Sequence, residues 1–230
     1  MNETASDRIN IITFRGVNCY LIKTKDEFIL VDSGFFNQRS NIERALNSAG
    51  VQPGNLRLIL LTHGDFDHTG NCAYFRDKYQ SKIAMHKADK GMVEQGDLFY
   101  SRKSRNIVIR LLVKLMLPIF RMNLRKKDHF SPDIYLEEGD DLSEYGFSAQ
   151  VVHIPGHSKG SIAFLSSERE LFIGDLLENH KKKGPVKGSL IDDTVELKTS
   201  IDKLKSLEID IVYPGHGRPF QMIDFTRKVD

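Results

Sequence analysis

The sequence has 230 residues, of which 40% are hydrophobic and 17 are glycine. This composition is that of an ordinary globular protein, so it excludes a disordered chain, a collagen and a coiled coil as descriptions of the whole molecule. With 33 Lys and Arg against 31 Asp and Glu, the net charge is +2, which gives no global reason to expect a nucleic acid or an acidic membrane as partner.

The cysteine content and the first residues bear on the cellular compartment. Cys19 and Cys72 cannot form a disulfide framework, and two cysteines are typical of small buried side chains in a reducing compartment. The first ten residues are polar and lack the apolar core of a secretory signal. No run of about 18 apolar residues predicts a membrane-spanning helix. We therefore expect a cytoplasmic protein.

Strand patterns open the chain, from residue 9 to residue 32, with turns at 15–16 and 25–26. The sequence Ser-Asn-Ile-Glu at 40–43 is a capping box, which predicts a helix start there, and Gly50 predicts its end. The short apolar run at 57–61 predicts a buried strand. The other expected elements are helices at 69–80 and 194–206 and strands at 82–86, 133–136, 147–154, 161–165, 170–173 and 209–213.

The two halves of the chain share one plan, in which strands come first and a helix follows. This order predicts two packed sheets with helices outside, an α/β sandwich within one domain that covers residues 1–230. Residues 87–130 depart from the plan because they are rich in Lys and Arg, and we expect them to form a helical insert. Its apolar stretch at 107–120 is too short to span a bilayer. We favour packing on the body or on a second subunit, with a lid over the site or a membrane contact as alternatives.

Side chains that can bind a metal follow the strand at 57–61. In extended backbone His63, Asp65 and Asp67 point to one side, and a turn into the next helix can bring His68 round. Loops at one end of a sheet are where functional sites are built. Three more potential ligands follow other apolar strands, each next to a glycine that allows a tight turn: His157, Asp175 and His216. Seven such groups predict a metal site.

These motifs, together with Val-Asp-Ser-Gly at 31–34, resemble in their order those of the metallo-β-lactamase fold hydrolases over nearly the whole chain. The resemblance implies a four-layer αβ/βα sandwich of two mixed sheets, with a two-metal site between sheet edges. It implies that Asp32 orients a ligand without binding metal. It also implies these ligands: for the first metal His63, Asp65 and His157, for the second Asp67, His68 and His216, and for both Asp175.

The family pattern is His-x-His-x-Asp-His, whereas this chain has Asp65 at the second histidine position. A carboxylate is a harder ligand than imidazole, so iron or manganese become alternatives to the two zinc ions that we expect first. We predict hydrolysis of a small ester, thioester, lactone or phosphodiester by a hydroxide that bridges both metals, oriented by Asp67. The alternatives are an iron-dependent oxidoreductase, which Asp65 motivates, and a nucleic-acid-processing hydrolase, which the basic insert motivates.

A run of lysines follows Asp175 closely in the sequence. Because Lys181, Lys182 and Lys183 are expected near the groove, they are candidates for holding a carboxylate or phosphate of a small-molecule substrate.

Overall fold

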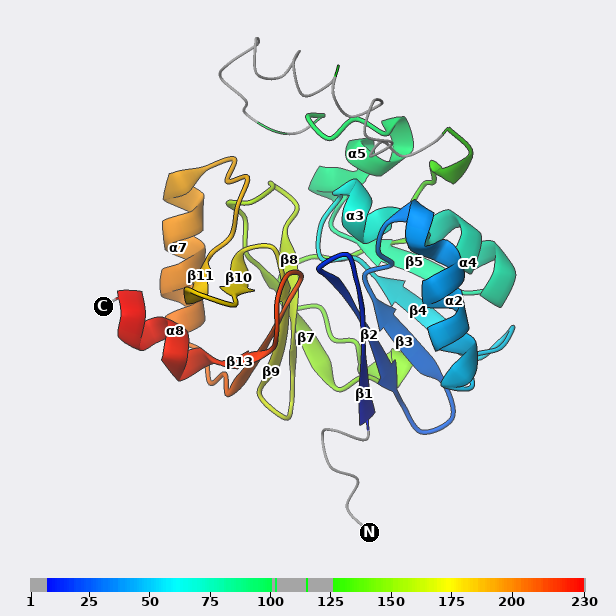
Figure 1. Ribbon diagram of the computed structural model, residues 1–230, viewed down its shortest axis with the longest axis horizontal. Helices are drawn as coiled ribbons and strands as arrows, with labels where there is room; N and C mark the ends of the chain where they lie inside the picture. Colours follow the sequence, from blue (N-terminus) through cyan, green and yellow to red (C-terminus); the bar gives the residue numbers. More distant parts are fainter. Residues whose placement is uncertain (1–7, 101, 103–114, 116–125, 230) are drawn as a thin grey trace.

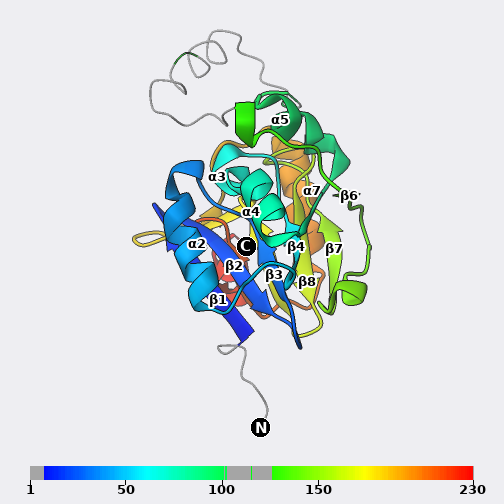
Figure 2. The ribbon, with the colours of Figure 1, turned by 90° about the vertical axis from the view of Figure 1, so that its right-hand side faces the viewer.

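The computed structural model describes residues 8–100, 102, 115 and 126–229, and most of its strands form two mixed sheets (Figures 1 and 2). In spatial order the first sheet contains β1 (Ile9–Phe14), β2 (Val17–Lys23), β3 (Phe28–Val31), β4 (Leu56–Leu60), β5 (Lys82–Met85) and β6 (Ile134–Tyr135). The second contains β13 (Phe220–Gln221), β12 (Ile211–Pro214), β9 (Glu170–Gly174), β8 (Ile162–Ser166) and β7 (Ala149–His153). A separate hairpin pairs β10 (Leu177–His180) with β11 (Gly184–Lys187).

The α-helices are α2 (Arg39–Ser48), α3 (Phe66–Thr69), α4 (Cys72–Tyr79), α5 (Lys90–Gln95), α7 (Thr194–Lys205) and α8 (Met222–Val229). Helices α2 and α4 cover the outer face of the first sheet, α7 and α8 cover that of the second, and α3 and α5 lie at the edge of the sandwich (Figure 1). Short 3-10 helices occupy η1 (Phe36–Gln38), η2 (Lys87–Asp89), η3 (Lys126–Asp128) and η4 (Ser143–Tyr145). The expected four-layer αβ/βα sandwich is confirmed.

Three buried apolar clusters fill the spaces between these layers. One lies between the first sheet and the helices α2 and α4, one lies between the two sheets, and one lies between the second sheet and the helices α7 and α8. Strand β4 contributes side chains to two of these clusters. Ile59 faces the cluster under α2 and α4, while Leu58 and Leu60 face the cluster between the sheets. A central strand that is buried on both faces has a continuous apolar sequence, as the run at 57–61 does.

An aromatic contact joins the two sheets at their centre. The ring of Tyr20 on β2 meets Phe172 on β9 edge-on, with centroids 5.4 Å apart, and it meets Tyr213 on β12 in the same way at 5.3 Å. The hydroxyl of Tyr20 donates a 2.5 Å hydrogen bond to the carbonyl of Pro214. This contact fixes β2 against β9 and β12, the strands that Asp175 and His216 follow.

Strand pairing also decides where the predicted ligands lie. β3 runs parallel to β4, and β9 runs parallel to β12, so within each pair the carboxyl ends share one sheet edge. The chain leaves these four strands just before Asp32, His63, Asp175 and His216. The fold therefore delivers the ligand candidates of both sheets to one edge of the sandwich.

One local expectation was wrong. Helix α2 begins at Arg39, and no side chain caps it, so Ser40 lies inside the helix and Glu43 instead forms an ion pair with Lys78 of α4. The helix expected at 69–80 is present as α4, which begins at Cys72, and a short additional helix, α3, precedes it. By contrast, α7 matches its expected range, and its N-terminal amides are capped by Asp193.

The expected insert is described only in part. Its first residues form η2 and α5, and its last ones form η3. The apolar stretch at 107–120 lies outside the described residues except for Leu115, whose side chain is exposed. Within the described part of the chain, no helix has the length and apolar character needed to cross a membrane.

We predict that Phe172→Ala lowers the free energy of unfolding by about 3–5 kcal/mol, the usual cost of truncating a buried aromatic ring. Phe172 is 1% exposed and contacts both Tyr20 and Tyr213, so its removal leaves a cavity between the sheets. Urea denaturation measures the change. Phe172→Leu retains part of the volume and should cost less, and equal losses would contradict the prediction.

Candidate metal centre

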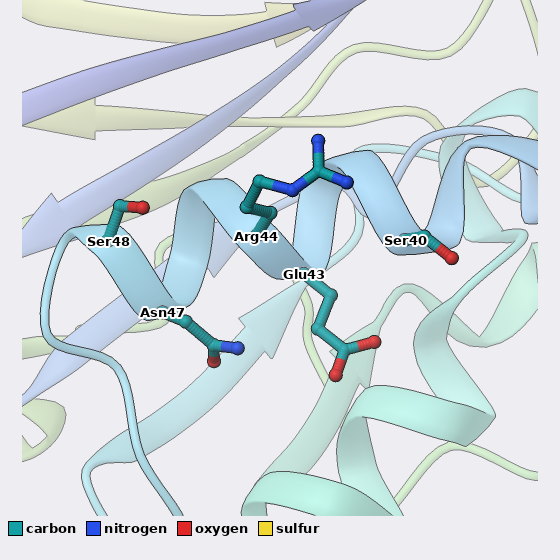
Figure 3. Close-up of a pocket in the computed structure, with 5 residues that line it drawn as sticks. All are labelled: Ser40, Glu43, Arg44, Asn47 and Ser48. Carbon is teal, nitrogen blue, oxygen red and sulfur yellow. The ribbon is translucent and has the colours of Figure 1, made fainter.

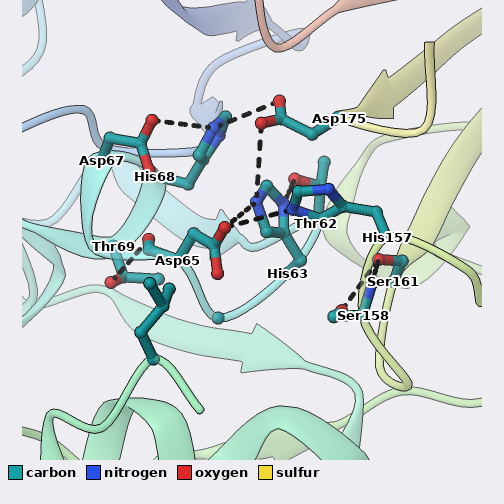
Figure 4. Close-up of polar contacts among 12 residues, drawn as sticks. Thr62, His63, Asp65, Asp67, His68, Thr69, His157, Ser158, Ser161 and Asp175 are labelled. Atoms are coloured by element: carbon teal, nitrogen blue, oxygen red, sulfur yellow. Dashed lines mark hydrogen bonds and ion pairs between the residues drawn. The ribbon is translucent and has the colours of Figure 1, made fainter. Parts of the chain in front are cut away.

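The structure brings all seven predicted ligands together at the edge of the sandwich, and Figure 4 labels all of them except His216. Asp67 and His68 lie on α3, and His63 and Asp65 lie on the turn that leads from β4 into α3. The other three follow β7, β9 and β12. Within each of three overlapping groups the ligand atoms lie within 4.8 Å of one another: His63, Asp65 and His157; His63, His68 and Asp175; Asp67, His68 and His216.

Four of these residues form what we call the second cluster: Asp67, His68, Asp175 and His216. The Nε2 atom of His68 lies 3.7 Å from Asp67 Oδ2 and 3.3 Å from Asp175 Oδ1. The Nε2 atom of His216 lies 3.5 Å from Asp67 Oδ2 and 3.1 Å from Asp175 Oδ2. Ligand bonds of 2.0–2.2 Å at tetrahedral angles place ligand atoms about 3.4 Å apart, so these spacings suit one divalent ion.

The first cluster consists of His63, Asp65 and His157. The Oδ2 atom of Asp65 lies 3.6 Å from His63 Nε2 and 3.1 Å from His157 Nε2. Asp175 lies between the clusters, because its Oδ2 atom is also 4.0 Å from His63 Nε2. The aspartate that replaces a histidine at position 65 therefore reaches its cluster.

Each of the four histidines is oriented by a hydrogen bond at the opposite ring nitrogen. Nδ1 of His157 bonds the carbonyl of Ser189, and Nδ1 of His216 bonds the carbonyl of Gly16, both at 3.0 Å. Nδ1 of His63 bonds the hydroxyl of Thr62 at 2.9 Å, and Nδ1 of His68 bonds the carboxylate of Asp32 at 2.8 Å. All four rings thus present Nε2 to the clusters, as metal-binding histidines do.

Several of the facing atoms have no hydrogen-bond partner although they are buried. They are His63 Nε2, His68 Nε2 and Asp175 Oδ1, whereas Asp65 Oδ1 lies 2.8 Å from Arg102 Nη2. A buried polar atom without a partner is costly, and a divalent ion in the second cluster would satisfy both His68 Nε2 and Asp175 Oδ1. The residues at this edge therefore fit a divalent metal.

The charges of the second cluster favour the same ligand. Burial disfavours the charged ring, but the carboxylates of Asp175 and Asp67 outweigh it and hold the pKa of His68 well above its usual value. Against the same burial, hydrogen bonds to Asp175 and Asp67 raise the pKa of His216 to about 10. The nearby imidazoles in turn hold the pKa of Asp175 well below its usual range, although burial acts the other way. These positive charges are what a divalent ion would replace.

Asp32 lies where the resemblance placed it, behind a ligand. Its Oδ2 atom accepts from Nδ1 of His68, and its carboxylate also accepts from the amide and the hydroxyl of Thr62. Its φ of 57° is in the left-handed region, which an aspartate tolerates better than most residues. The strained backbone is held because three donors converge on one buried carboxylate.

Close backbone approach explains the glycine before His216. A Cβ atom on Gly215 would lie 2.2 Å from Asp175 Oδ1 and 2.7 Å from Cε1 of His68. Any larger residue there would push apart two members of the second cluster. The Pro-Gly-His sequence is therefore a steric requirement of the site.

Asp89 is a structural carboxylate that the sequence analysis missed. It is fully buried, and it accepts from the amides of Gly64 and Gly160 and from the hydroxyl of Ser158. The three donors belong to the loops that carry His63, Asp65 and His157. No local pattern marks Asp89, because its donors lie 25 to 71 residues away in the sequence.

Arg102 is the second residue that the sequence analysis did not place in the site. Its Nη2 atom lies 2.8 Å from the Asp65 carboxylate and 3.1 Å from His157 Nε2. Against the effect of burial, this guanidinium and His157 hold the pKa of Asp65 well below its usual range. The sequence showed Arg102 only as one of several basic residues in the insert.

The predicted lysines lie away from these contacts. Lys181, Lys182 and Lys183 are exposed in the turn between β10 and β11, and the carbonyl of Lys183 accepts from Lys228 of α8. Their role in substrate binding stays a prediction. Cys72 is not a ligand in this structure, because its buried thiol donates to Ser33 and burial raises its pKa to about 12.

A surface depression outside the metal centre lies along α2 (Figure 3). None of the seven ligand candidates lines it, and its lining is polar and exposed in character: Ser40, Glu43, Arg44, Asn47 and Ser48. Its Glu43 is already paired with Lys78, so we assign it no part in the chemistry.

Comparison with known proteins gives a family match over most of the chain. Residues 12–216 match the sequence model of the Metallo-beta-lactamase superfamily. The human acyl-coenzyme A thioesterase MBLAC2 is 26% identical over 88% of this chain and 74% of its own. The Aspergillus fumigatus atrochrysone carboxyl ACP thioesterase is 28% identical over 88% of this chain.

Some relatives are considerably longer than this chain, and one solved structure matches it over nearly its whole length. The chain spans 51% of the Aspergillus thioesterase and 61% of a Caenorhabditis elegans relative, Beta-lactamase-like protein 2 homolog, which is 25% identical over 95% of this chain. The crystal structure of TTHA1623 in a di-iron-bound form superposes with a TM-score of 0.71 and 27% identity, covering 95% of this chain and 96% of that chain.

We predict that Asp32→Ala weakens divalent metal binding by about 10- to 100-fold, the usual effect of removing the partner of a metal-binding histidine. Competition with a chromophoric chelator measures the affinity. Asp32→Asn keeps an oxygen acceptor and should weaken binding less. Unchanged affinity in Asp32→Ala would show that His68 needs no such support.

We predict that Asp89→Ala lowers the free energy of unfolding by at least about 3 kcal/mol, because three buried donors lose their acceptor. Urea denaturation again provides the measurement. Asp89→Asn retains one carbonyl oxygen and should cost less. A loss below about 1 kcal/mol in the alanine variant would mean that the loops are held by other contacts.

Proposed function

Because this chain belongs to the metallo-β-lactamase superfamily, a family of metal-dependent hydrolases, we propose that it binds divalent metal at the clustered residues and hydrolyses a small thioester or ester. The observation that carries the proposal is the second cluster. Its two imidazole nitrogens and two carboxylates lie 3.1–3.7 Å apart, and His68 Nε2 and Asp175 Oδ1 are buried without partners. These distances are close to the spacing expected between the ligands of one tetrahedral divalent ion.

Two roles are proposed for the residues of the second cluster, which are to hold the ion and to accept a proton from water. A divalent ion in this cluster supplies Lewis acidity and a water of lowered pKa. His68 and His216 would hold the ion through Nε2, and Asp175 would contribute a buried carboxylate from the other sheet. Of the two carboxylates in the cluster, that of Asp67 is more exposed than that of Asp175, at 16% against 7%. Asp67 can therefore orient an attacking water and accept its proton.

The substrate class is supported by the relatives. The human relative is named as an acyl-coenzyme A thioesterase and the Aspergillus relative as an ACP thioesterase. Hydrolysis of a thioester requires a polarised carbonyl and an aligned water, whereas the thiolate leaves readily. One well-placed metal ion can supply both requirements. Lactones and phosphodiesters require the same groups and belong in the same substrate panel.

The metal is proposed as zinc, with iron or manganese as alternatives. Imidazole-rich second-cluster ligands suit zinc, whereas the carboxylate of Asp65 and the di-iron form of the similar structure favour harder ions. Metal analysis of protein purified without added metal decides between them. Iron accompanied by oxygen consumption would favour an oxidoreductase over a hydrolase.

We predict that His68→Ala and His216→Ala each lower hydrolysis of an acyl-thioester by at least about 100-fold, because each removes one of four ligands. Both should also lower the metal content of the purified protein. The panel contains an acyl-coenzyme A, a lactone and a bis-aryl phosphate, with metal content measured on the same samples.

His180→Ala is the matched control, because His180 pairs with Glu178 on the hairpin and belongs to neither cluster. It should keep the metal content and activity of the wild type. Full activity in both cluster variants would refute the proposed site. Activity confined to the phosphate would retain the site but change the substrate class.

A further inference from the structure

A cationic side chain reaches the first cluster from the basic insert. Nη2 of Arg102 lies 2.8 Å from the carboxylate of Asp65 and 3.1 Å from Nε2 of His157. The guanidinium side chain is only 6% exposed. The contact therefore takes place inside the protein, among the atoms that would hold the first metal.

Asp65 and Arg102 are matched to each other by charge. A buried guanidinium is costly unless an anion compensates it, and Asp65 provides that anion at hydrogen-bond distance. A histidine at position 65, which the family pattern places there, would leave Arg102 without this carboxylate. The departure from the pattern at position 65 and the arginine from the insert therefore compensate one another.

The guanidinium and a metal ion compete for the same atom. Nδ1 of His157 faces the carbonyl of Ser189, which only accepts, so Nδ1 carries a proton. The opposite nitrogen, Nε2, is therefore the one that a metal in the first cluster would have to bond, and it lies 3.1 Å from both Arg102 Nη2 and Asp65 Oδ2. A metal ion there would have to displace the guanidinium from this nitrogen and from the carboxylate of Asp65.

The second cluster shows no such competition. In the part of the chain that the structure describes, the ion pairs formed by Asp67 and Asp175 all involve histidines. No arginine or lysine contacts its ligands among the described residues, whereas Asp65 and His157 of the first cluster both contact Arg102. The two clusters therefore differ in charge although both have ligands of the right type.

We propose that Arg102 supplies the cation of the first cluster, so that the chain holds one metal ion, in the second cluster, with a guanidinium beside it. This inference rests on the proposed function, since it assumes that the second cluster binds metal.

The test is the number of metal ions bound per chain. Wild-type protein and Arg102→Met are stripped of metal and titrated with Co²⁺, followed by visible absorption, and with Zn²⁺ in competition with a chromophoric chelator. We expect one equivalent in the wild type. In Arg102→Met we expect a second equivalent that binds at least about 10-fold tighter than any second equivalent in the wild type.

Two further variants keep the test sharp. Asp65→His with Arg102→Met restores the three-histidine pattern and should bind two equivalents. Arg8→Met is the matched control, because Arg8 forms an ion pair with the buried Glu170 at the start of β9, the opposite end of that strand from Asp175, and it should leave the stoichiometry at one. Circular dichroism confirms folding, and Arg102→Gln replaces Arg102→Met should the latter fail to fold.

The outcomes separate the two proposals. No metal in the wild type would overturn the proposed function itself. Two equivalents of similar affinity in the wild type would overturn only the role of Arg102. One equivalent in the wild type and in both Arg102 variants would likewise overturn it, because the guanidinium would then not be what excludes the second ion.

Discussion

Buried charge has to be balanced inside the protein, and this requirement organises the edge of the sandwich. Four histidines, the carboxylates of Asp32, Asp65, Asp67 and Asp175, and the guanidinium of Arg102 converge there, and most are nearly inaccessible to water. Each imidazole is held from behind by an acceptor, and each cluster carboxylate faces a cationic or potentially cationic group. The apolar layers stabilise this convergence of charge because they fix the strands that precede the charged residues.

Much of this arrangement was predictable from local sequence. Apolar runs mark strands, and the polar residues directly after them mark the edge where strands end, so His63, His68, Asp175 and His216 could be assigned together. The family resemblance then supplied the pairing of ligands into clusters and the role of Asp32. The structure brings these residues to one edge because the parallel β3/β4 and β9/β12 pairs align their carboxyl ends, while their roles as ligands stay a prediction.

The rest depended on contacts between distant segments. Asp89 binds donors in two other loops, and Arg102 contacts Asp65 and His157 across 37 and 55 residues, so neither role leaves a periodic signal. The capping-box sequence at 40–43 does not form the predicted cap, because Glu43 forms an ion pair with Lys78 of another helix instead. The β10–β11 hairpin was hidden because its lysines and glycine are also typical of an exposed loop.

The bond between His216 and the carbonyl of Gly16 joins residues that are 200 positions apart. Nearby, Val17 forms a β-bridge with His216, and the amide of Asn18 donates to Gly215. His216 can take up this orientation only once the segment after β12 has docked on the hairpin of β1 and β2. A metal bound at the proposed site would therefore link the two ends of the chain, and its binding would stabilise the assembled sandwich over partly folded forms.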